Sequence, residues 1–237
     1  MKNKYIDLIE QTFDFPQDGF MLKDGYLQFH NISLKKLIDT YGTPLRIVYL
    51  PKISEQIKKA RTLFDKAFEK NDYKANYYYC YCTKSNHFSY VLDEVLSNGT
   101  QIETSSSFDI DLLRKLYKKG SISKKTIIIN NGFKTKEYAI KIAGLINDGF
   151  SNVIPVCDNK EELYFYDKYV KAEKCNIGIR VATSEEPNFE FYTSRLGIPN
   201  RDVLSFYEKK IATNKKFCLK MLHFFIDTGI KDSIYYW

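Results

Sequence analysis

Short apolar runs alternate with amphipathic helical segments over most of the chain. Strand-like runs are predicted at 77–82, 100–104, 126–130, 152–156, 176–182 and 219–226, and the helical segments between them lie at 87–97, 108–118, 135–147, 159–167 and 201–209. Continuous apolar runs are typical of strands that are covered on both faces. This alternation predicts an α/β fold with a parallel sheet and helical crossovers.

The number of strand–helix units limits the possible architecture. A closed (β/α)8 barrel takes about 250 residues, whereas the chain has 237 residues and supplies about six of the eight units. We therefore expect an incomplete TIM-type barrel over 51–237 and a separate N-terminal segment over 1–50, and we interpret the chain as a fragment of a longer protein. In and after that segment the pattern predicts a helix at 34–40, a strand at Leu45–Leu50 and a helix at 52–69.

The composition excludes several classes of protein. Apolar residues make up 44% and charged residues 27% of the chain, which is typical of a globular protein and not of a disordered one. No apolar run approaches the roughly 18 residues of a membrane span, and the N-terminus does not resemble a secretory signal. The five cysteines are odd in number and scattered, which indicates reduced side chains in a cytoplasmic protein.

The net charge of +7 is spread along the chain, often as lysine pairs such as Lys118-Lys119. A nucleic-acid binder would concentrate this excess, so solvated helix ends and loops are the favoured interpretation. We expect neither a nucleic acid nor a membrane as a partner. The histidines and cysteines also lack the spacing of a metal site, and none is predicted.

Chemistry in parallel α/β folds lies at the carboxyl ends of the strands. Lys84 follows the first barrel strand, where we expect little water around its ammonium; the amine would then form a Schiff base with an aldehyde, unless Lys84 is one more solvated lysine. Glu103 and Arg180 could pair across the barrel floor, for function or as an ordinary ion pair. Thr228 and Gly229 offer a phosphate a hydroxyl and a free backbone, or form a plain turn.

Several segments resemble motifs of the alanine-racemase-fold decarboxylases, which use pyridoxal phosphate and act on arginine, ornithine, lysine or diaminopimelate. The run from Tyr79 to Asn86 is similar to the lysine motif of that family, roughly Tyr-x-Val-Lys-x-Asn. The turn Asn130-Asn131-Gly132-Phe133-Lys134 looks like that of arginine decarboxylases. Further similar segments, in the order of the family, are Tyr41-Gly42-Thr43-Pro44-Leu45, Ile102-Glu103-Thr104-Ser105-Ser106, Ile177-Gly178-Ile179-Arg180, Ser194-Arg195-Leu196-Gly197 and Leu222-His223-Phe224-Phe225-Ile226.

The resemblance implies roles for particular residues. Lys84 would hold pyridoxal 5'-phosphate as a Schiff base, and Glu103 with Arg180 would form the polar layer beneath the cofactor ring. Phe225 stands where the family commonly has a histidine stacked on the ring, and Thr228 stands where it has a serine near the phosphate. Asp227 replaces a usual glycine, which places a negative charge close to the expected phosphate.

The resemblance implies decarboxylation of a basic amino acid, with arginine converted to agmatine for polyamine biosynthesis. A homodimer is expected for the full-length protein, whose active site uses a C-terminal β domain that this chain lacks; we therefore expect the chain to be inactive by itself. The alternatives are a single-barrel protein of pyridoxal phosphate homeostasis, a non-catalytic regulatory relative and a racemase of the same fold.

Overall fold

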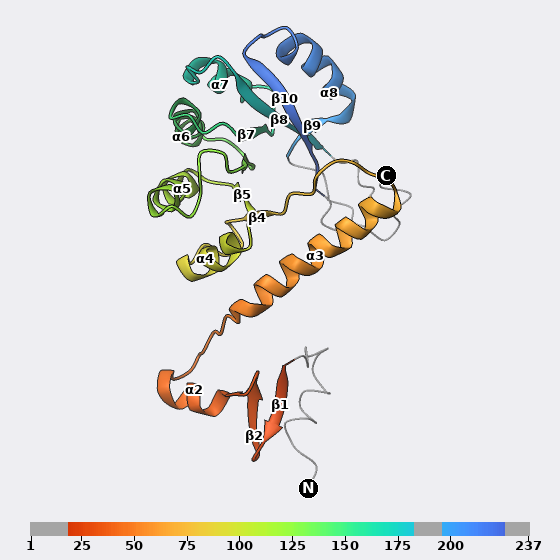
Figure 1. Ribbon diagram of the computed structural model, residues 1–237. Helices are drawn as coiled ribbons and strands as arrows, with labels where there is room; N and C mark the ends of the chain where they lie inside the picture. The colour runs from red at the N-terminus through yellow and green to blue at the C-terminus, as the bar shows by residue number, and fades with distance from the viewer. Residues whose placement is uncertain (1–18, 183–195, 226–237) are drawn as a thin grey trace, which may run out of the picture. The chain divides into compact units, whose positions relative to one another are not determined.

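The computed structural model describes residues 19–182 and 196–225 of the chain (Figure 1). The chain divides into two compact units, Met1–Tyr49 and Leu50–Trp237. Every buried apolar side chain of the described core lies between Ile57 and Phe217, so the second unit carries its own core.

The first unit contains a small antiparallel meander that the sequence pattern does not predict. Its strands are β1 (Phe20–Lys23), β2 (Tyr26–Phe29) and β3 (Ile32–Ser33). Asp24 and Gly25 both have positive φ, at 52° and 77°, as the tight turn of a two-residue hairpin requires. Helix α2 (Leu34–Tyr41) follows as predicted, and the Ser33 hydroxyl caps it by accepting from the backbone N–H of Lys36.

The strand predicted at Leu45–Leu50 is wrong. Residues 45–49 pair with no other strand in the described part of the chain, and Leu50 is the first residue of α3 (Leu50–Lys70). An apolar run forms a strand only where a neighbour supplies hydrogen bonds. Pro51 does not end a strand; it lies in the first turn of the helix, where its missing N–H has no intrahelical partner to lose.

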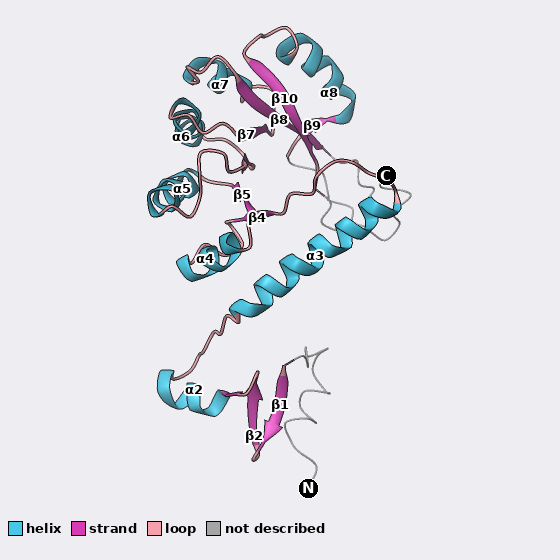
Figure 2. Cartoon of the chain, in the orientation of Figure 1, coloured by secondary structure: helices cyan, strands magenta, loops and turns pink. Residues whose placement is uncertain are grey.

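The second unit is built on a seven-stranded sheet in which all the strand pairs are parallel (Figure 2). The strands are β4 (Cys80–Cys82), β5 (Gln101–Thr104), β6 (Ile128–Asn130), β7 (Val153–Cys157), β8 (Cys175–Ala182) and β10 (Phe217–His223), hydrogen-bonded in that order. A short strand, β9 (Ile198–Pro199), also pairs with β8 and is not predicted by the sequence. The parallel sheet with strands in chain order is therefore confirmed.

Helices alternate with these strands. They are α4 (Ser89–Ser97), α5 (Ser107–Lys119), α6 (Lys136–Asn147), α7 (Leu163–Tyr169) and α8 (Asn200–Phe206), which runs on into a π-helical turn, η1 (Tyr207–Ile211). Figure 1 shows α4 to α7 side by side along one face of the curved sheet. The incomplete TIM-type barrel expected from the sequence is confirmed.

The serine-rich turn after β5 starts α5. Ser106 is the N-cap, and it forms a capping box with Asp109. The Asp109 carboxylate also accepts from the backbone N–H of Ser105 and of Ser106, at 2.9 and 3.0 Å. Gly120 ends the helix with a φ of 80°, a left-handed conformation that glycine adopts without strain.

Strand periodicity sorts side chains between the two faces of this sheet. Successive residues of a strand point to opposite faces. Ile102, Ile128, Ile177 and Ile179 are fully buried in one core with the helices. The alternate positions, which include Glu103, therefore point to the inner face of the partial barrel.

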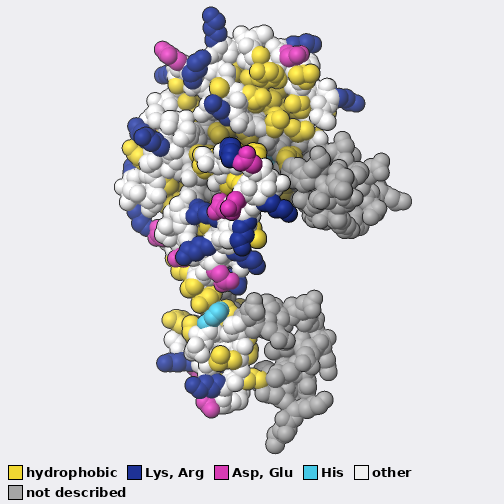
Figure 3. Space-filling model, turned by 45° about the vertical axis from the view of Figure 1, so that its right-hand side comes forward, with side chains coloured by type: hydrophobic (Ala, Val, Ile, Leu, Met, Phe, Trp, Pro, Cys, Tyr) yellow, Lys and Arg dark blue, Asp and Glu magenta, His cyan; other side chains and the backbone are white. Residues whose placement is uncertain are grey.

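Charged side chains are distributed over the surface of the second unit. Figure 3 shows its lysines and arginines scattered over the visible face, with acidic side chains among them. Within residues 19–182 and 196–225, no helix combines the length and the apolar character that crossing a membrane requires.

Candidate active site

The carboxyl ends of the barrel strands bring polar side chains together on the inner face of the sheet. Arg180 on β8 and His223 on β10 occupy paired positions, so their side chains share a face. Glu103 on β5 and two residues just past their strands, Asn131 after β6 and Asp158 after β7, have the same inward parity. We call these residues the inner polar ring: Glu103, Asn131, Asp158, Arg180 and His223.

Asn131 connects two members of the inner polar ring. Its Nδ2 donates to Glu103 Oε1 at 3.3 Å and lies 3.0 Å from Nε2 of His223. The three residues are far apart in the chain, and β5, β6 and β10 bring them within hydrogen-bond reach. Glu103 was a predicted site residue, whereas Asn131 and His223 stood only within segments that resemble the family.

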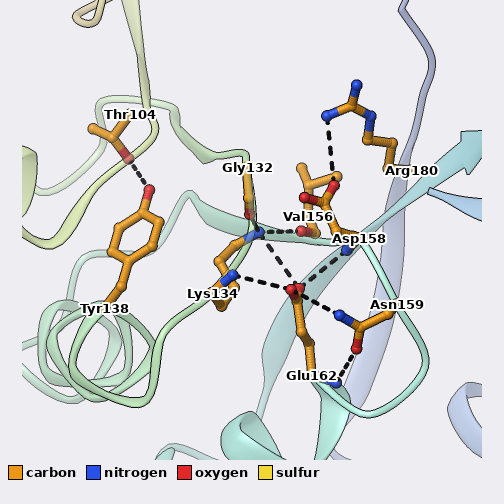
Figure 4. Close-up of polar contacts among 9 residues, drawn as sticks. All are labelled: Thr104, Gly132, Lys134, Tyr138, Val156, Asp158, Asn159, Glu162 and Arg180. Atoms are coloured by element: carbon orange, nitrogen blue, oxygen red, sulfur yellow. Dashed lines mark hydrogen bonds and ion pairs between the residues drawn. The ribbon is translucent and has the colours of Figure 1, made fainter. Parts of the chain in front are cut away.

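The predicted pair of Glu103 and Arg180 is wrong. Arg180 Nη1 lies 3.6 Å from Oδ1 of Asp158 (Figure 4), and no ion pair joins Arg180 to Glu103 in the described residues. The physical reason is strand order, because β6 and β7 lie between β5 and β8. Asp158 follows the strand that directly neighbours β8, so its carboxylate reaches the guanidinium first.

Several buried polar atoms of the inner polar ring have no hydrogen-bond partner in the part of the chain that the structure describes. They are Asn131 Oδ1, both carboxylate oxygens of Asp158 and His223 Nδ1. Burial lowers the pKa of His223; the carboxylate of Glu103 opposes this shift, and the charge of Arg180 adds to it. Buried polar atoms without a partner are costly, which marks this ring as a place for function.

Phe225 lies at the next inward position beyond His223. The residue is 49% exposed, and the Arg180 guanidinium carbon lies 5.9 Å from the centroid of its ring. The guanidinium therefore lies near both an aromatic ring and the Asp158 carboxylate. Thr228 and Asp227, the positions expected near a phosphate, lie outside the described residues.

Lys84 lies where it was predicted, two residues after β4. Its side chain is exposed, so the expectation of little water around its ammonium is wrong for this structure. The preceding residue is anchored, because Thr83 is fully buried and its N–H donates to the Glu103 carbonyl at 3.0 Å. The turn therefore holds the backbone of Lys84 beside β5 and leaves its amine open to solvent.

A second lysine follows a barrel strand and has a different environment. Lys134, after β6, is completely buried, and its Nζ lies 3.5 Å from Glu162 Oε2 (Figure 4). Its ammonium also donates to the carbonyl oxygens of Gly132 and Val156. Glu162 accepts in turn from the backbone N–H groups of Lys134 and Asp158, both at 3.0 Å. All these contacts make Lys134 a structural lysine.

Two consecutive asparagines show how strand parity divides structure from candidate function. Asn130 points toward the helices and donates to Thr104 Oγ1 at 2.7 Å, and that oxygen lies 2.8 Å from the Tyr138 hydroxyl of α6. Asn131 points inward, to the inner polar ring. A sequence signal for these residues existed, because Asn131 and Asp158 follow the strands predicted at 126–130 and 152–156, and His223 lies within the strand predicted at 219–226. Their partners depend on the order of the strands in space.

The cysteines beside the ring are not activated. Burial, together with the nearby Glu103 carboxylate, raises the pKa of the Cys80 thiol to about 11 and also raises the pKa of Cys82. Both thiols stay protonated at neutral pH, and a protonated thiol is a poor nucleophile. No cluster of potential metal ligands occurs within 19–182 and 196–225.

Comparison with curated proteins places the chain beside one group of enzymes. It is 26% identical over 227 residues to the biosynthetic arginine decarboxylase of Phocaeicola vulgatus and 25% identical over 215 residues to that of Bacteroides thetaiotaomicron, covering 88% and 84% of this chain. It is 24% identical over 201 residues to chloroplastic arginine decarboxylase 1A of Nicotiana tabacum, covering 80% of this chain. The predicted resemblance to arginine decarboxylases is confirmed.

The chain spans 34%, 33% and 27% of these relatives, about a third of their length. No protein-family model matches it.

Solved structures show the same fold. Diaminopimelate decarboxylase of M. jannaschii, in complex with L-lysine, aligns with a TM-score of 0.71 and 17% identity over 89% of this chain and 48% of its own. The biosynthetic arginine decarboxylase of Campylobacter jejuni aligns with a TM-score of 0.65 and 21% identity over 90% of this chain and 37% of its own. These likenesses establish the architecture of the barrel unit.

Proposed function

We propose that this chain forms the cofactor-binding part of a decarboxylase that uses pyridoxal phosphate and acts on a basic amino acid, with arginine as substrate and agmatine as product. The observation that carries the proposal is Lys84, an exposed amine directly after the first barrel strand, in a chain similar to arginine decarboxylases. The chain spans about a third of those relatives, so the activity is a proposal about the longer protein.

The two lysines that follow barrel strands differ in what their amines can do. A primary amine condenses with an aldehyde only when its lone pair is free. Lys134 is fully buried and donates to carbonyl oxygens beside the Glu162 carboxylate. The Lys84 side chain is exposed, and its ammonium forms no ion pair within the described residues. Lys84 is therefore the residue that we assign to the cofactor aldehyde.

The other predicted residues fit a charged aromatic cofactor. Glu103 and Arg180 supply opposite charges on the inner face, and the Asp158 carboxylate, which pairs with Arg180, accepts no hydrogen bond within the described residues. Phe225 offers an aromatic face for stacking. Unlike histidine, phenylalanine cannot donate a proton or titrate. The role of Thr228 at the phosphate remains a proposal.

Pyridoxal phosphate, when bound, supplies an electron sink for the carbanion that remains as carbon dioxide leaves. The residues of this chain supply part of the site that holds it. Lys84 would hold the cofactor aldehyde through its amine, and the inner polar ring would present fixed charges beneath the mouth of the barrel. We propose a homodimer for the longer protein, in which further residues complete the site.

The test begins with the attachment of the cofactor. The 237-residue chain is incubated with pyridoxal phosphate and reduced with borohydride, and its peptides are analysed by mass spectrometry. We expect the added mass on the peptide that contains Lys84. Lys84→Ala removes the label, whereas Lys118→Ala, an exposed lysine of α5, retains it. Equal labelling of many lysines, or none at Lys84, contradicts the proposal.

The substrate is tested separately by release of carbon dioxide from carboxyl-labelled amino acids. We expect little or no release by this chain alone and release from arginine, ahead of ornithine, lysine and diaminopimelate, by the longer protein. Robust release by the chain alone contradicts the expected inactivity. Preference for another of the four amino acids contradicts the arginine assignment and leaves the decarboxylase assignment standing.

One alternative has a specific observation in its favour. Leu50–Trp237 forms one compact unit that contains part of one barrel, an architecture shared with a single-barrel protein of pyridoxal phosphate homeostasis. Labelling of Lys84 without decarboxylation by the longer protein would support this alternative. A non-catalytic regulatory relative is less well supported, because Lys84 is present.

A further inference from the structure

The amide of Asn131 has one orientation that satisfies both of its neighbours. Its Nδ2 lies 3.3 Å from Glu103 Oε1 and 3.0 Å from His223 Nε2. A side-chain amide nitrogen carries two hydrogens and accepts none. A flipped amide would place Oδ1 against the Glu103 carboxylate, where two acceptors would repel each other. Glu103 therefore determines which way the Asn131 amide faces.

The amide in turn determines the state of the imidazole. Because Asn131 presents a donor, His223 Nε2 must accept, and an accepting nitrogen carries no hydrogen. The single hydrogen of the neutral ring then lies on Nδ1, which is buried and has no partner in the described part of the chain. A cationic imidazole would carry a hydrogen on both nitrogens and would clash with the amide.

We propose that Asn131 is a positioning residue that, oriented by Glu103, holds His223 as an uncharged donor with its hydrogen on Nδ1 at the mouth of the barrel. The tautomer follows from the geometry alone. Its use in catalysis rests on the proposed function, since it is there that the inner polar ring would lie beneath a cofactor.

Charged groups near His223 act in both directions on its imidazole, and burial decides the balance in favour of the uncharged form. Arg180, at the paired position of β8, and Lys134, after β6, disfavour a cation, whereas Glu103 on β5 and Asp158 after β7 favour one. Burial has the largest effect and lowers the pKa of His223. With His223 neutral, the inner polar ring contains two carboxylates and one guanidinium. The inner polar ring therefore keeps a net negative charge, which suits a cationic amine.

The test is the tautomer of His223, measured by long-range proton–nitrogen NMR on the full 15N-labelled chain. The chain has only three histidines, and His30 and His87 are exposed. The signals that disappear in the His223→Gln variant are therefore those of His223. We expect a bare Nε2 and a hydrogen-bearing Nδ1 at neutral pH. A hydrogen on Nε2, or a cationic ring at neutral pH, overturns the proposal.

Two variants test whether Glu103 orients Asn131 and whether Asn131 sets the protonation state of His223. Asn131→Asp replaces the donor by a carboxylate, so we expect the apparent pKa of His223 to rise by about 1–3 units. Glu103→Gln removes the charge that orients the amide, so we expect hydrogen on Nε2 to become populated. Asn71→Asp, at the exposed end of α3, is the matched control and leaves His223 unchanged. If neither Asn131→Asp nor Glu103→Gln alters the pKa or the tautomer of His223, the proposal is wrong.

The readout separates this proposal from the proposed function. Both the tautomer and its response to the variants are measured without pyridoxal phosphate. Absence of borohydride labelling at Lys84, together with the expected tautomer, would contradict the cofactor assignment alone. Labelling at Lys84 with hydrogen on Nε2 would contradict the positioning role alone. If Asn131→Asp does not fold, the wild-type tautomer and Glu103→Gln still decide the outcome.

Discussion

Gly178 lies on the inner face of β8, where the neighbouring strand approaches closely. A Cβ built at this position would lie 2.9 Å from Cγ2 of Val156, which is fully buried on β7. Contacts this short force a core to shift. The family-like motif around Gly178 therefore has a packing reason as well as a functional one, because only glycine lets β7 and β8 close up beside Arg180.

We expect Gly178→Ala to lower the free energy of unfolding by about 1–3 kcal/mol, the usual cost of overpacking a core. The matched control is Gly144→Ala in α6, where the new methyl group meets only Nη2 of the long Arg114 side chain, at 3.2 Å. There alanine gains about 0.5–1 kcal/mol through helix propensity. Urea unfolding of both variants measures the contrast, and equal effects would contradict the packing argument.

Lys134 provides a second test at the scale of a residue. Its side chain and that of Glu162 are 0% and 2% exposed, and removal of one partner of a buried pair leaves an uncompensated charge. We expect Lys134→Met to destabilise the chain by about 3–5 kcal/mol. Lys136→Met, exposed two residues later, should change stability by less than about 0.5 kcal/mol.

A double variant checks that the loss of stability in Lys134→Met arises from the Glu162 carboxylate that is left without its partner. Lys134→Met with Glu162→Gln should lose less stability than the two single changes together, because residues in direct contact are not additive. Thermal or urea unfolding measures all three proteins. Full additivity would show that the pair does not act as a unit.

At the scale of elements, the turn after β5 shows how local chemistry sets a helix boundary. We expect Ser106→Ala to cost about 1 kcal/mol, because the hydroxyl accepts from the Asp109 N–H and no other group in the capping box can replace it. Ser107→Ala is the control, since the Ser107 hydroxyl is no part of the cap. Equal destabilisation of both variants in urea would rule out a capping role for Ser106.

Element boundaries were predictable where their cause is local. The helix at 34–40 begins at a serine cap, and the structure places α2 at Leu34–Tyr41 with Ser33 as that cap. Strand boundaries were predicted less well. The run at 77–82 contains only the short strand β4 (Cys80–Cys82), because the ladder with β5 begins at Cys80 and Gln101.

At the scale of the whole molecule, His223 couples the inner polar ring to stability. Burial lowers the pKa of His223 in the folded chain below the unfolded value of about 6.5. A lowered pKa means that the unfolded chain binds the proton more readily. The contribution of His223 to stability is therefore complete above that unfolded value and is lost as the pH falls through the folded one.

We expect the wild-type chain to lose more stability than His223→Gln between about pH 7 and pH 5. The extra slope is at most about 1.4 kcal/mol per pH unit, the value for one proton. The carboxylates titrate in both proteins, so the difference between them isolates His223, and His87→Gln serves as the exposed control. Urea unfolding measures the free energy of unfolding of each protein at each pH. A difference between wild type and His223→Gln that stays constant over this pH range would contradict the prediction.

The sequence by itself determined the order of the six main strands and the helices between them, the start of the helix at 34–40 and the family that the chain resembles. These depend on hydrophobic period and on groups a few residues apart, which the chain order preserves. Only the tertiary structure decided that Arg180 pairs with Asp158 instead of Glu103, that Lys134 is buried while Lys84 is exposed, and that residues 45–49 pair with no strand among the described residues. Each of these depends on which distant strands become neighbours and which face a side chain points to, because hydrogen bonds and ion pairs act only over a few ångströms.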